Sequence, residues 1–159
     1  MTDEVIRQEP ALAALSDATL AVRRLVGASQ DLTVRTAREM EMNVSDMTAV
    51  MALSEHGPMG VAELARRLGV SSPATPVLVA RLARAGHVER VRAAVDRRRV
   101  RVTDTSAGRA ATLHAWLPAI REIDEVCRSL SASEQVFVRE VLDRLTGAMA
   151  RSARSVKLS

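Results

Sequence analysis

Aromatic residues and cysteine are nearly absent from this chain of 159 residues. It has one tryptophan, Trp116, one phenylalanine, Phe137, and no tyrosine. Proteins that bind single-stranded nucleic acid usually stack the bases on aromatic rings, so this composition disfavours a single-strand or RNA binder. The lone cysteine, Cys127, cannot form an internal disulfide or supply a multi-cysteine zinc site, which agrees with a reducing compartment.

Long hydrophobic runs are also missing. The longest stretch without a formal charge, residues 68–80, contains two prolines and is shorter than the roughly 20 apolar residues that cross a bilayer. The first ten residues include acids and have no basic and apolar sequence of the kind that starts a secretory signal. With 47% hydrophobic residues, the composition predicts one soluble domain, and we expect a cytoplasmic protein.

Positive charge is concentrated in one part of the chain. The whole sequence carries a net charge of +4, with 23 basic and 19 acidic residues. Residues 60–103, however, contain ten arginines against only Glu63, Glu89 and Asp96. Such a local cluster is typical of a protein that binds a polyanion, and a solvated arginine-rich face is the alternative interpretation.

Helical periodicity dominates the sequence, and glycines mark the ends of several segments. We predict amphipathic helices at both ends of the chain, and a helix at 45–55 that follows Ser45 and ends before Gly57. We also predict a helix at 61–68 that stops at Gly69, and another that ends before Gly86. The start of this last helix is open: Ser72 could cap it with Pro73 at the first position, or Thr75 with Pro76 there.

Alternation of valine and polar residues predicts a strand over 100–103 and an antiparallel partner over 87–91. A long helical pattern then runs from Ser106 to Leu130, and Ser131 with Glu134 forms a capping box that begins the last helix. The predicted order is four helices, a hairpin and two helices. A helix-turn-helix followed by a basic hairpin is a winged helix, whose second helix enters the DNA major groove.

Several short motifs occur in the order found in one protein family. They are Glu63-Leu64-Ala65, Leu68-Gly69-Val70-Ser71, Arg81-Leu82 with Gly86, Val88 and Arg90, then Asp96-Arg97-Arg98 and Thr105-Ser106-Ala107-Gly108. With these motifs the chain resembles the MarR family of bacterial winged helix-turn-helix transcription regulators. The resemblance covers about residues 45–110, and the outer helices agree with the family in pattern only.

The resemblance implies a mainly α fold with a small β-hairpin, in which residues 1–159 form a single MarR-like domain. Residues 45–105 would be the winged helix-turn-helix DNA-binding lobe, and residues 10–42 and 106–153 the dimerisation helices. It further implies a homodimer on a pseudopalindromic double-stranded DNA operator, often a repressor released by a small lipophilic or phenolic effector. The apolar stripes of the outer helices support a dimer, since one small lobe could not bury them.

A winged-helix protein-interaction module without DNA binding is the rival interpretation. The arginine-rich segment argues against it, since the core of a protein interface is depleted of charge.

In the hairpin, the resemblance implies that Asp96 holds the guanidinium of Arg98 and so fixes the shape of the wing. Arg97 and Arg99 would then meet phosphates or the narrow minor groove. An ordinary turn residue is the alternative for Asp96.

The second helix of the helix-turn-helix is expected to turn Leu78, Val79 and Leu82 inward. Its surface offers few groups that read bases, so we expect DNA shape to matter. Many family members carry a polar or basic residue where Val77 stands. Thr75-Pro76 resembles the hydroperoxide-sensing branch, but the N-terminal cysteine of that branch is missing. The DNA-binding candidates on and before this helix are Ser71, Ser72, Ala74, Thr75, Val77, Arg81 and Arg84.

No motif points to catalysis, a metal or another cofactor. The three histidines do not share a ligand spacing, and no nucleophile has a base at a recognisable distance in the sequence, so we expect no enzyme activity. Cys127 lies on an apolar stripe, where packing is the simpler interpretation and a redox role the minor one. Leu142 and Leu145 are candidates for the dimer interface. Pro118 predicts a kink in its helix.

Overall fold

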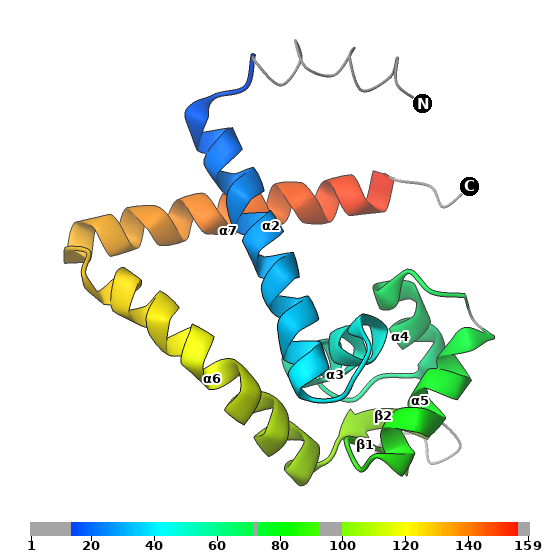
Figure 1. Cartoon of the computed structure of the whole chain (residues 1–159). Coiled ribbons are helices and arrows are strands. Elements are labelled where there is room, and N and C mark those ends of the chain that lie inside the picture. Colours follow the sequence, from blue (N-terminus) through cyan, green and yellow to red (C-terminus); the bar gives the residue numbers. More distant parts are fainter. Residues whose placement is uncertain (1–13, 72, 93–99, 156–159) are drawn as a thin grey trace, which may run out of the picture. The chain divides into compact units, whose positions relative to one another are not determined.

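The computed structural model describes residues 14–71, 73–92 and 100–155. Within these ranges the chain forms six helices and one two-stranded sheet (Figure 1). In chain order they are α2 (Asp17–Glu39), α3 (Val44–His56), α4 (Val61–Leu68), α5 (Ala74–Arg84), β1 (Val88–Arg92), β2 (Val100–Asp104), α6 (Ser106–Arg128) and α7 (Ala132–Ser155). The chain divides into two compact units, the first ending at Ala115 and the second beginning at Trp116. The predicted element order is confirmed.

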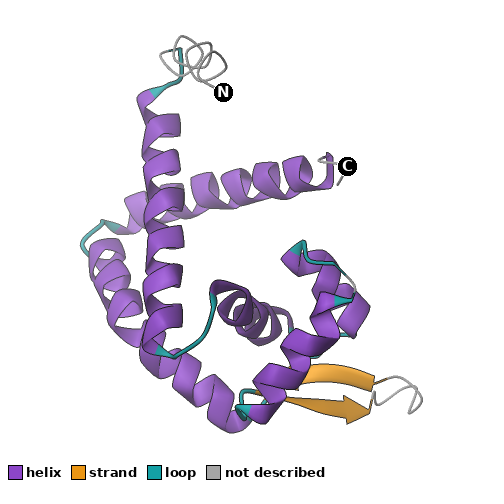
Figure 2. Ribbon diagram, turned by 45° about the vertical axis from the view of Figure 1, so that its right-hand side comes forward, coloured by secondary structure: helices purple, strands orange, loops and turns teal. Residues whose placement is uncertain are grey.

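The first unit contains a winged helix. β1 and β2 pair antiparallel, with Val88 opposite Asp104 and Arg92 opposite Val100, and α5 packs against β1 (Figure 2). Met59, between α3 and α4, forms an isolated antiparallel bridge with Val102 of β2. Its amide donates to the Val102 carbonyl at 3.0 Å, and the Val102 amide donates back at 2.8 Å. These bonds tie the hairpin to the loop that leads into the helix-turn-helix.

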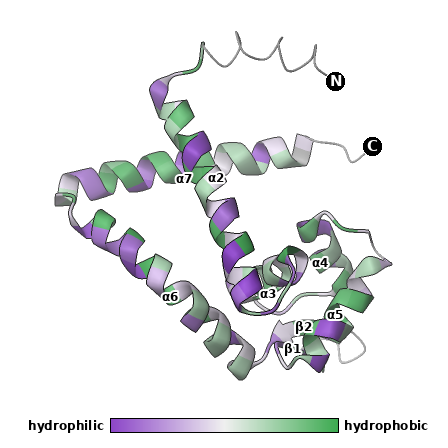
Figure 3. Cartoon of the chain, in the orientation of Figure 1, coloured by the Kyte–Doolittle hydropathy of each residue, from purple (hydrophilic) through white to green (hydrophobic). Residues whose placement is uncertain are grey.

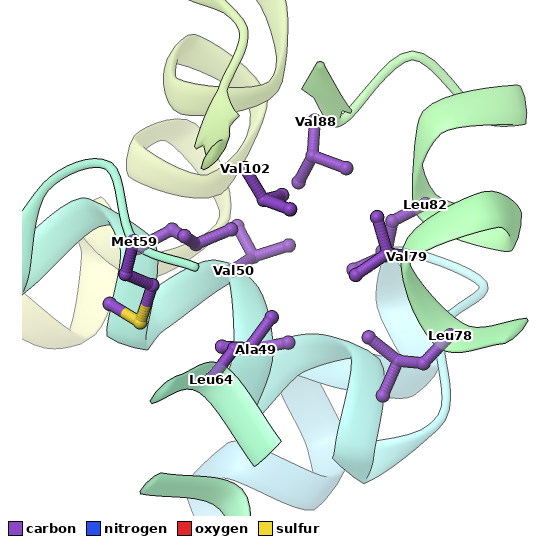
Figure 4. Packing of buried hydrophobic residues seen from close by; sticks show 10 residues of the cluster. Ala49, Val50, Met59, Leu64, Leu78, Val79, Leu82, Val88 and Val102 are labelled. Carbon is purple, nitrogen blue, oxygen red and sulfur yellow. The ribbon is translucent and has the colours of Figure 1, made fainter. Parts of the chain in front are cut away.

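One hydrophobic core holds α3, α4, α5 and the hairpin together (Figure 4). The predicted inward residues of α5 all lie in it, and their side chains face residues of α3 and the sheet. Burial of each such side chain contributes about 1.5–3 kcal/mol to folding. The core consists of Ala49, Val50, Leu53, Met59, Leu64, Leu78, Val79, Leu82, Val88 and Val102.

Local capping chemistry explains where α3 and α4 begin and end. Gly57 (φ 75°) and Gly69 (φ 62°) end the two helices in conformations that favour glycine, as predicted. The start of α3 differs slightly from the prediction, because Asn43 rather than Ser45 precedes its first turn. The Asn43 Oδ1 atom accepts from the Asp46 amide at 2.8 Å, so α3 begins at Val44.

The start of α5 excludes one of the two alternatives left open by the sequence. Pro73 already has helical dihedral angles, φ −66° and ψ −29°, and the helix begins at Ala74. Thr75-Pro76 therefore lies inside the first turn, where the missing amide of Pro76 costs no hydrogen bond. No side-chain cap bond is present at Pro73, and Ser72 lies outside the described residues.

The second unit consists of the end of α6 and all of α7. The predicted capping box is confirmed: the Ser131 amide donates to the Glu134 carboxylate at 2.8 Å, and the Glu134 amide donates to the Ser131 hydroxyl at 3.4 Å. α6 is assigned as one helix through Pro118; the kink stays a prediction. None of the described side chains from Trp116 onward is buried, and apolar and polar residues alternate along both helices (Figure 3).

Cys127 corrects another expectation. Its side chain is exposed rather than packed, because the second unit supplies no core for the apolar stripe on which it lies. None of the described helices is both long and apolar enough to span a bilayer.

Candidate nucleic-acid interface

The outward face of α5 is the centre of the candidate site. With 3.6 residues per turn, Val77, Ala80 and Arg84 lie opposite the buried stripe of this helix. All three are exposed, and Val77 is 64% exposed. Ala74, also exposed, begins the helix. This face offers one guanidinium and otherwise small or apolar groups, so it can contact thymine methyl groups and phosphates more readily than it can read bases by hydrogen bonds.

Thr75 does not belong to this face, although its hydroxyl is a candidate DNA contact in the sequence. The residue is fully buried, and its hydroxyl donates to the Ser71 carbonyl at 3.3 Å. The same carbonyl accepts from the Ala74 amide at 3.1 Å. Thr75 thus secures the turn between α4 and α5, and the exposed Ser71 takes part through its backbone.

Arg81 is held by a residue that the sequence pattern does not single out. Its Nε donates to Asp46 Oδ2 at 2.9 Å and its Nη2 to Asp46 Oδ1 at 2.7 Å. The Arg81 side chain is 47% exposed, whereas that of Asp46 is only 6% exposed. These bonds and the neighbouring negative charge raise the pKa of the Arg81 guanidinium above its ordinary value. Arg81, a DNA-binding candidate from the sequence, is therefore exposed, and its guanidinium is also bound to Asp46.

A signal for this ion pair is present in the sequence. Asp46 shares the spacing of Val50 and Leu53, which are the apolar positions of α3. A carboxylate on an apolar stripe needs a partner of opposite charge, because burying it alone is costly. Arg81 is such a partner, but only the fold shows that it lies within reach.

A groove of about 400 Å³ lies between the start of α3 and α5. The exposed Ser45 contributes a hydroxyl and Asn43 a side-chain amide. The guanidinium of Arg81 lies at the same groove. The lining residues are Asn43, Ser45, Val70, Ala74, Val77, Leu78 and Arg81.

The hairpin adds three exposed arginines, Arg90, Arg92 and Arg101, of which none is predicted from the sequence as an individual contact. Arg92 is the last residue of β1, and Arg101 is the second residue of β2. The predicted wing residues themselves, Asp96, Arg97, Arg98 and Arg99, lie outside the described residues.

A second fork anchors the base of the hairpin to α6. Arg109 donates from Nε to Asp104 Oδ2 at 2.8 Å and from Nη2 to Oδ1 at 2.9 Å. The Asp104 side chain is 2% exposed. Hydrogen bonding from Arg109 lowers the pKa of Asp104 and outweighs the opposing effect of burial. The Thr105 hydroxyl donates to the Gly86 carbonyl at 2.6 Å and accepts from the Gly108 amide at 2.9 Å. The start of α6 is thereby fixed to the end of α5.

Among residues 14–71, 73–92 and 100–155, no three His, Cys, Asp or Glu side chains come together as a metal site.

In a comparison with known proteins, residues 40–99 match the model of the MarR family. An uncharacterized HTH-type transcriptional regulator of Bacillus subtilis, YcgE, is 26% identical over 121 residues, which are 76% of this chain and 79% of that protein. The crystal structure of RV1404 from Mycobacterium tuberculosis is similar with a TM-score of 0.62 and 25% identity, covering 86% of this chain and 97% of that one.

A MarR family protein from Bacillus stearothermophilus has a TM-score of 0.66 at 24% identity. That comparison covers 86% of this chain and 99% of the other, and at this identity it supports the fold alone.

Proposed function

We propose that this chain, whose residues 40–99 match the MarR family of transcription regulators, is a regulator of that family and binds a pseudopalindromic double-stranded DNA operator as a homodimer. The observation that carries the proposal is the winged-helix lobe, in which the exposed face of α5 and the hairpin arginines Arg90, Arg92 and Arg101 supply positive charge. In this arrangement α5 enters the major groove and the wing reaches the adjoining minor groove.

Arg84 is the exposed cation on the outward face of α5. It can take a guanine or a phosphate, while Ala74 and Val77 contact thymine methyl groups. Because these side chains offer few directional bonds, recognition relies on the shape of the DNA as well as on its sequence. Arg97 and Arg99, in the wing, are proposed to meet phosphates or the narrow minor groove, with Asp96 and Arg98 fixing the wing.

The homodimer is supported by the second unit. The large apolar side chains of this unit that are exposed in the single chain are Ile120, Ile123, Val126, Val136, Phe137, Leu142 and Met149. An apolar surface of this extent on two helices is typical of a subunit interface. A two-fold dimer would place its two α5 helices about one helical turn of DNA apart, roughly 34 Å.

We further propose that the protein is a cytoplasmic repressor that a small lipophilic or phenolic effector releases from DNA. The resemblance to the MarR family supports this proposal, and the effector acts only if its affinity differs between two shapes of the dimer.

Fluorescence anisotropy with random-sequence duplex DNA at low salt tests the basic proposal. The wild-type protein should bind with an affinity that falls steeply as salt rises, since each phosphate contact releases counterions. Selection from a random duplex library should then return a two-fold symmetric site. Absence of binding at low salt would instead favour a winged-helix module that binds another protein.

Alanine at Arg97 and Arg99 tests the wing. The double variant should bind all duplexes more weakly and show a smaller slope of log affinity against log salt, by about one unit for each phosphate that the wing no longer neutralises. Wild-type binding across the salt range would show that the wing does not touch DNA.

A further inference from the structure

The ion pair between Asp46 and Arg81 joins the first turn of α3 to the second half of α5. The carboxylate is almost completely buried, while the guanidinium remains half exposed. This asymmetry means that the fixed partner is Asp46 and the accessible partner is Arg81. Asp46 therefore determines where an accessible positive charge is held beside the candidate DNA-binding face.

A guanidinium presents two edges that can each donate a pair of parallel hydrogen bonds. Asp46 accepts from the edge formed by Nε and Nη2. The other edge, formed by Nη1 and the second hydrogen of Nη2, keeps its capacity to bind another acceptor. Because the first edge is held at both nitrogens, the orientation of the second edge is fixed as well.

This second edge belongs to a side chain that lines the groove between α3 and α5. On α5, Arg81 lies on the flank between the buried stripe and the outward face marked by Val77 and Arg84. The other polar side chains of the groove, Ser45 and Asn43, can both donate hydrogen bonds. A ligand that accepts several hydrogen bonds and carries negative charge fits this set.

The position of Arg81 along α5 favours a phosphate over a base. Residues at the start of a recognition helix are those that reach base edges. Arg81 instead lies in the last turn of α5, which ends at Arg84. An arginine at this distance from the helix start is suited to the DNA backbone, where bidentate binding of phosphate oxygens matches its geometry.

We propose that Asp46 is a positioning residue that holds Arg81 in place to bind a phosphate of the DNA backbone. The inference rests on the proposed DNA-binding function and adds to it two residues with separate roles: Arg81 contacts the phosphate, and Asp46 acts through Arg81. A preoriented arginine loses less side-chain entropy when it binds, so the carboxylate strengthens a contact that its own charge would otherwise weaken.

The sign of one substitution distinguishes positioning from simple electrostatics. Asp46→Asn removes a negative charge from the DNA-binding lobe, and Coulomb attraction alone predicts tighter binding. Positioning predicts weaker binding, because a neutral amide accepts through one oxygen only and leaves the guanidinium less well held. We expect about threefold weaker binding for Asp46→Asn at about 0.1 M salt, since a charge-assisted fork is only partly removed.

The experiment measures anisotropy with several duplexes of different sequence, across a range of salt, for wild type and four variants. Arg81→Ala should bind about tenfold more weakly and lower the salt slope by about one unit per lobe. Arg81→Lys keeps the charge but loses the fork, so it should weaken binding and retain the slope. Asp46→Asn combined with Arg81→Ala should bind no more weakly than Arg81→Ala alone, because Asp46 acts through Arg81.

Two matched controls separate other causes. Glu63→Gln, in α4, changes the net charge by the same amount as Asp46→Asn. The Glu63 side chain is partly exposed, and its Oε1 lies 3.8 Å from Arg67 Nη2. This variant should leave binding unchanged or tighten it up to twofold. Asp104→Asn breaks the other buried fork, that with Arg109. It controls for a loss of stability: because this fork anchors the hairpin, Asp104→Asn can weaken binding by the wing, but it should leave the contribution of Arg81 intact, so that adding Arg81→Ala weakens binding as much as it does in wild type.

Three results would overturn the inference while wild-type binding stands. Tighter binding by Asp46→Asn would show that the carboxylate acts by charge alone. Unchanged binding by Arg81→Ala would remove Arg81 from the interface. A loss confined to duplexes with a particular base pair would make Arg81 a base reader instead. Failure of the wild-type protein to bind any duplex at low salt would refute the proposed function itself.

Discussion

Substitution of Gly108 by alanine provides a quantitative test of how the wing is joined to α6. Gly108 is buried in the first turn of α6. A Cβ atom at this position would lie 2.3 Å from the carbonyl oxygen of His87, 2.7 Å from its Cα and 2.8 Å from its carbonyl carbon. All three are backbone atoms, so no side-chain rotation can relieve the contact. Either α6 or the segment before β1 has to move.

The cost follows from what that movement disrupts. Two hydrogen bonds join these segments: the Thr105 amide donates to the His87 carbonyl at 3.0 Å, and the Thr105 hydroxyl donates to the Gly86 carbonyl at 2.6 Å. Weakening both costs about 1–2 kcal/mol, and overpacking a filled site costs about 1–3 kcal/mol more. Alanine recovers about 1 kcal/mol through its higher helix propensity. The free energy of unfolding should therefore fall by about 1–4 kcal/mol.

Gly147→Ala is the matched control in another helix. A Cβ atom on Gly147 would meet only the Nη1 atom of Arg151, at 3.4 Å, so helix propensity should dominate and stabilise the protein by about 0.5–1 kcal/mol. Thermal unfolding followed by circular dichroism, at one fixed protein concentration, should give a midpoint for Gly108→Ala that is about 2–16 °C lower than that of wild type. A midpoint for Gly108→Ala at or above the wild-type value would refute the close approach of α6 to His87.

Three further predictions concern the dimer, acid stability and the proline of α6. Leu142→Asp should convert the proposed dimer to a monomer in sedimentation equilibrium and abolish operator binding with it; a dimer that persists would place the interface elsewhere. Because hydrogen bonding to Arg109 lowers the pKa of Asp104, the stability that Asp104 contributes is complete above about pH 4 and lost as the pH falls below it. Between about pH 6 and pH 3, the free energy of unfolding measured with urea should therefore fall less in Asp104→Asn than in wild type. Equal decreases in the two proteins would contradict this assignment. Pro118→Ala should change how strongly an effector alters DNA affinity, with the fluorescence of Trp116 reporting the ligand; unchanged coupling would rule out a hinge at Pro118.

The parts of the fold that depend on local chemistry could be predicted from the sequence. Gly57 and Gly69 end their helices as expected, because a residue with positive φ stops a helix whatever lies around it. The capping box of Ser131 and Glu134 is equally local, with both partners three residues apart.

The features that sequence reasoning misses depend on residues distant in the chain. Asp46 and Arg81 are 35 positions apart, so no periodicity connects them, and the helical pattern of α5 alone does not show that Arg81 binds a carboxylate. Thr75 is a different case, because its spacing places it on the buried stripe while its hydroxyl suggests a DNA contact. Burial decides the outcome, since the hydroxyl finds its acceptor in the Ser71 carbonyl.

The exposure of Cys127 leads to a conclusion about stability. Periodicity places it on an apolar stripe, and that stripe exists, yet in the single chain none of the described side chains of the second unit is buried. Helical segments that bury no side chain, such as α7 and the part of α6 from Trp116 onward, gain little hydrophobic free energy to offset the entropy of ordering them. If the proposed homodimer supplies the missing core, α7 is stable only while the subunits are associated. The unfolding midpoint should then rise with protein concentration. Cys127 would then be protected from thiol reagents in the dimer and accessible in Leu142→Asp.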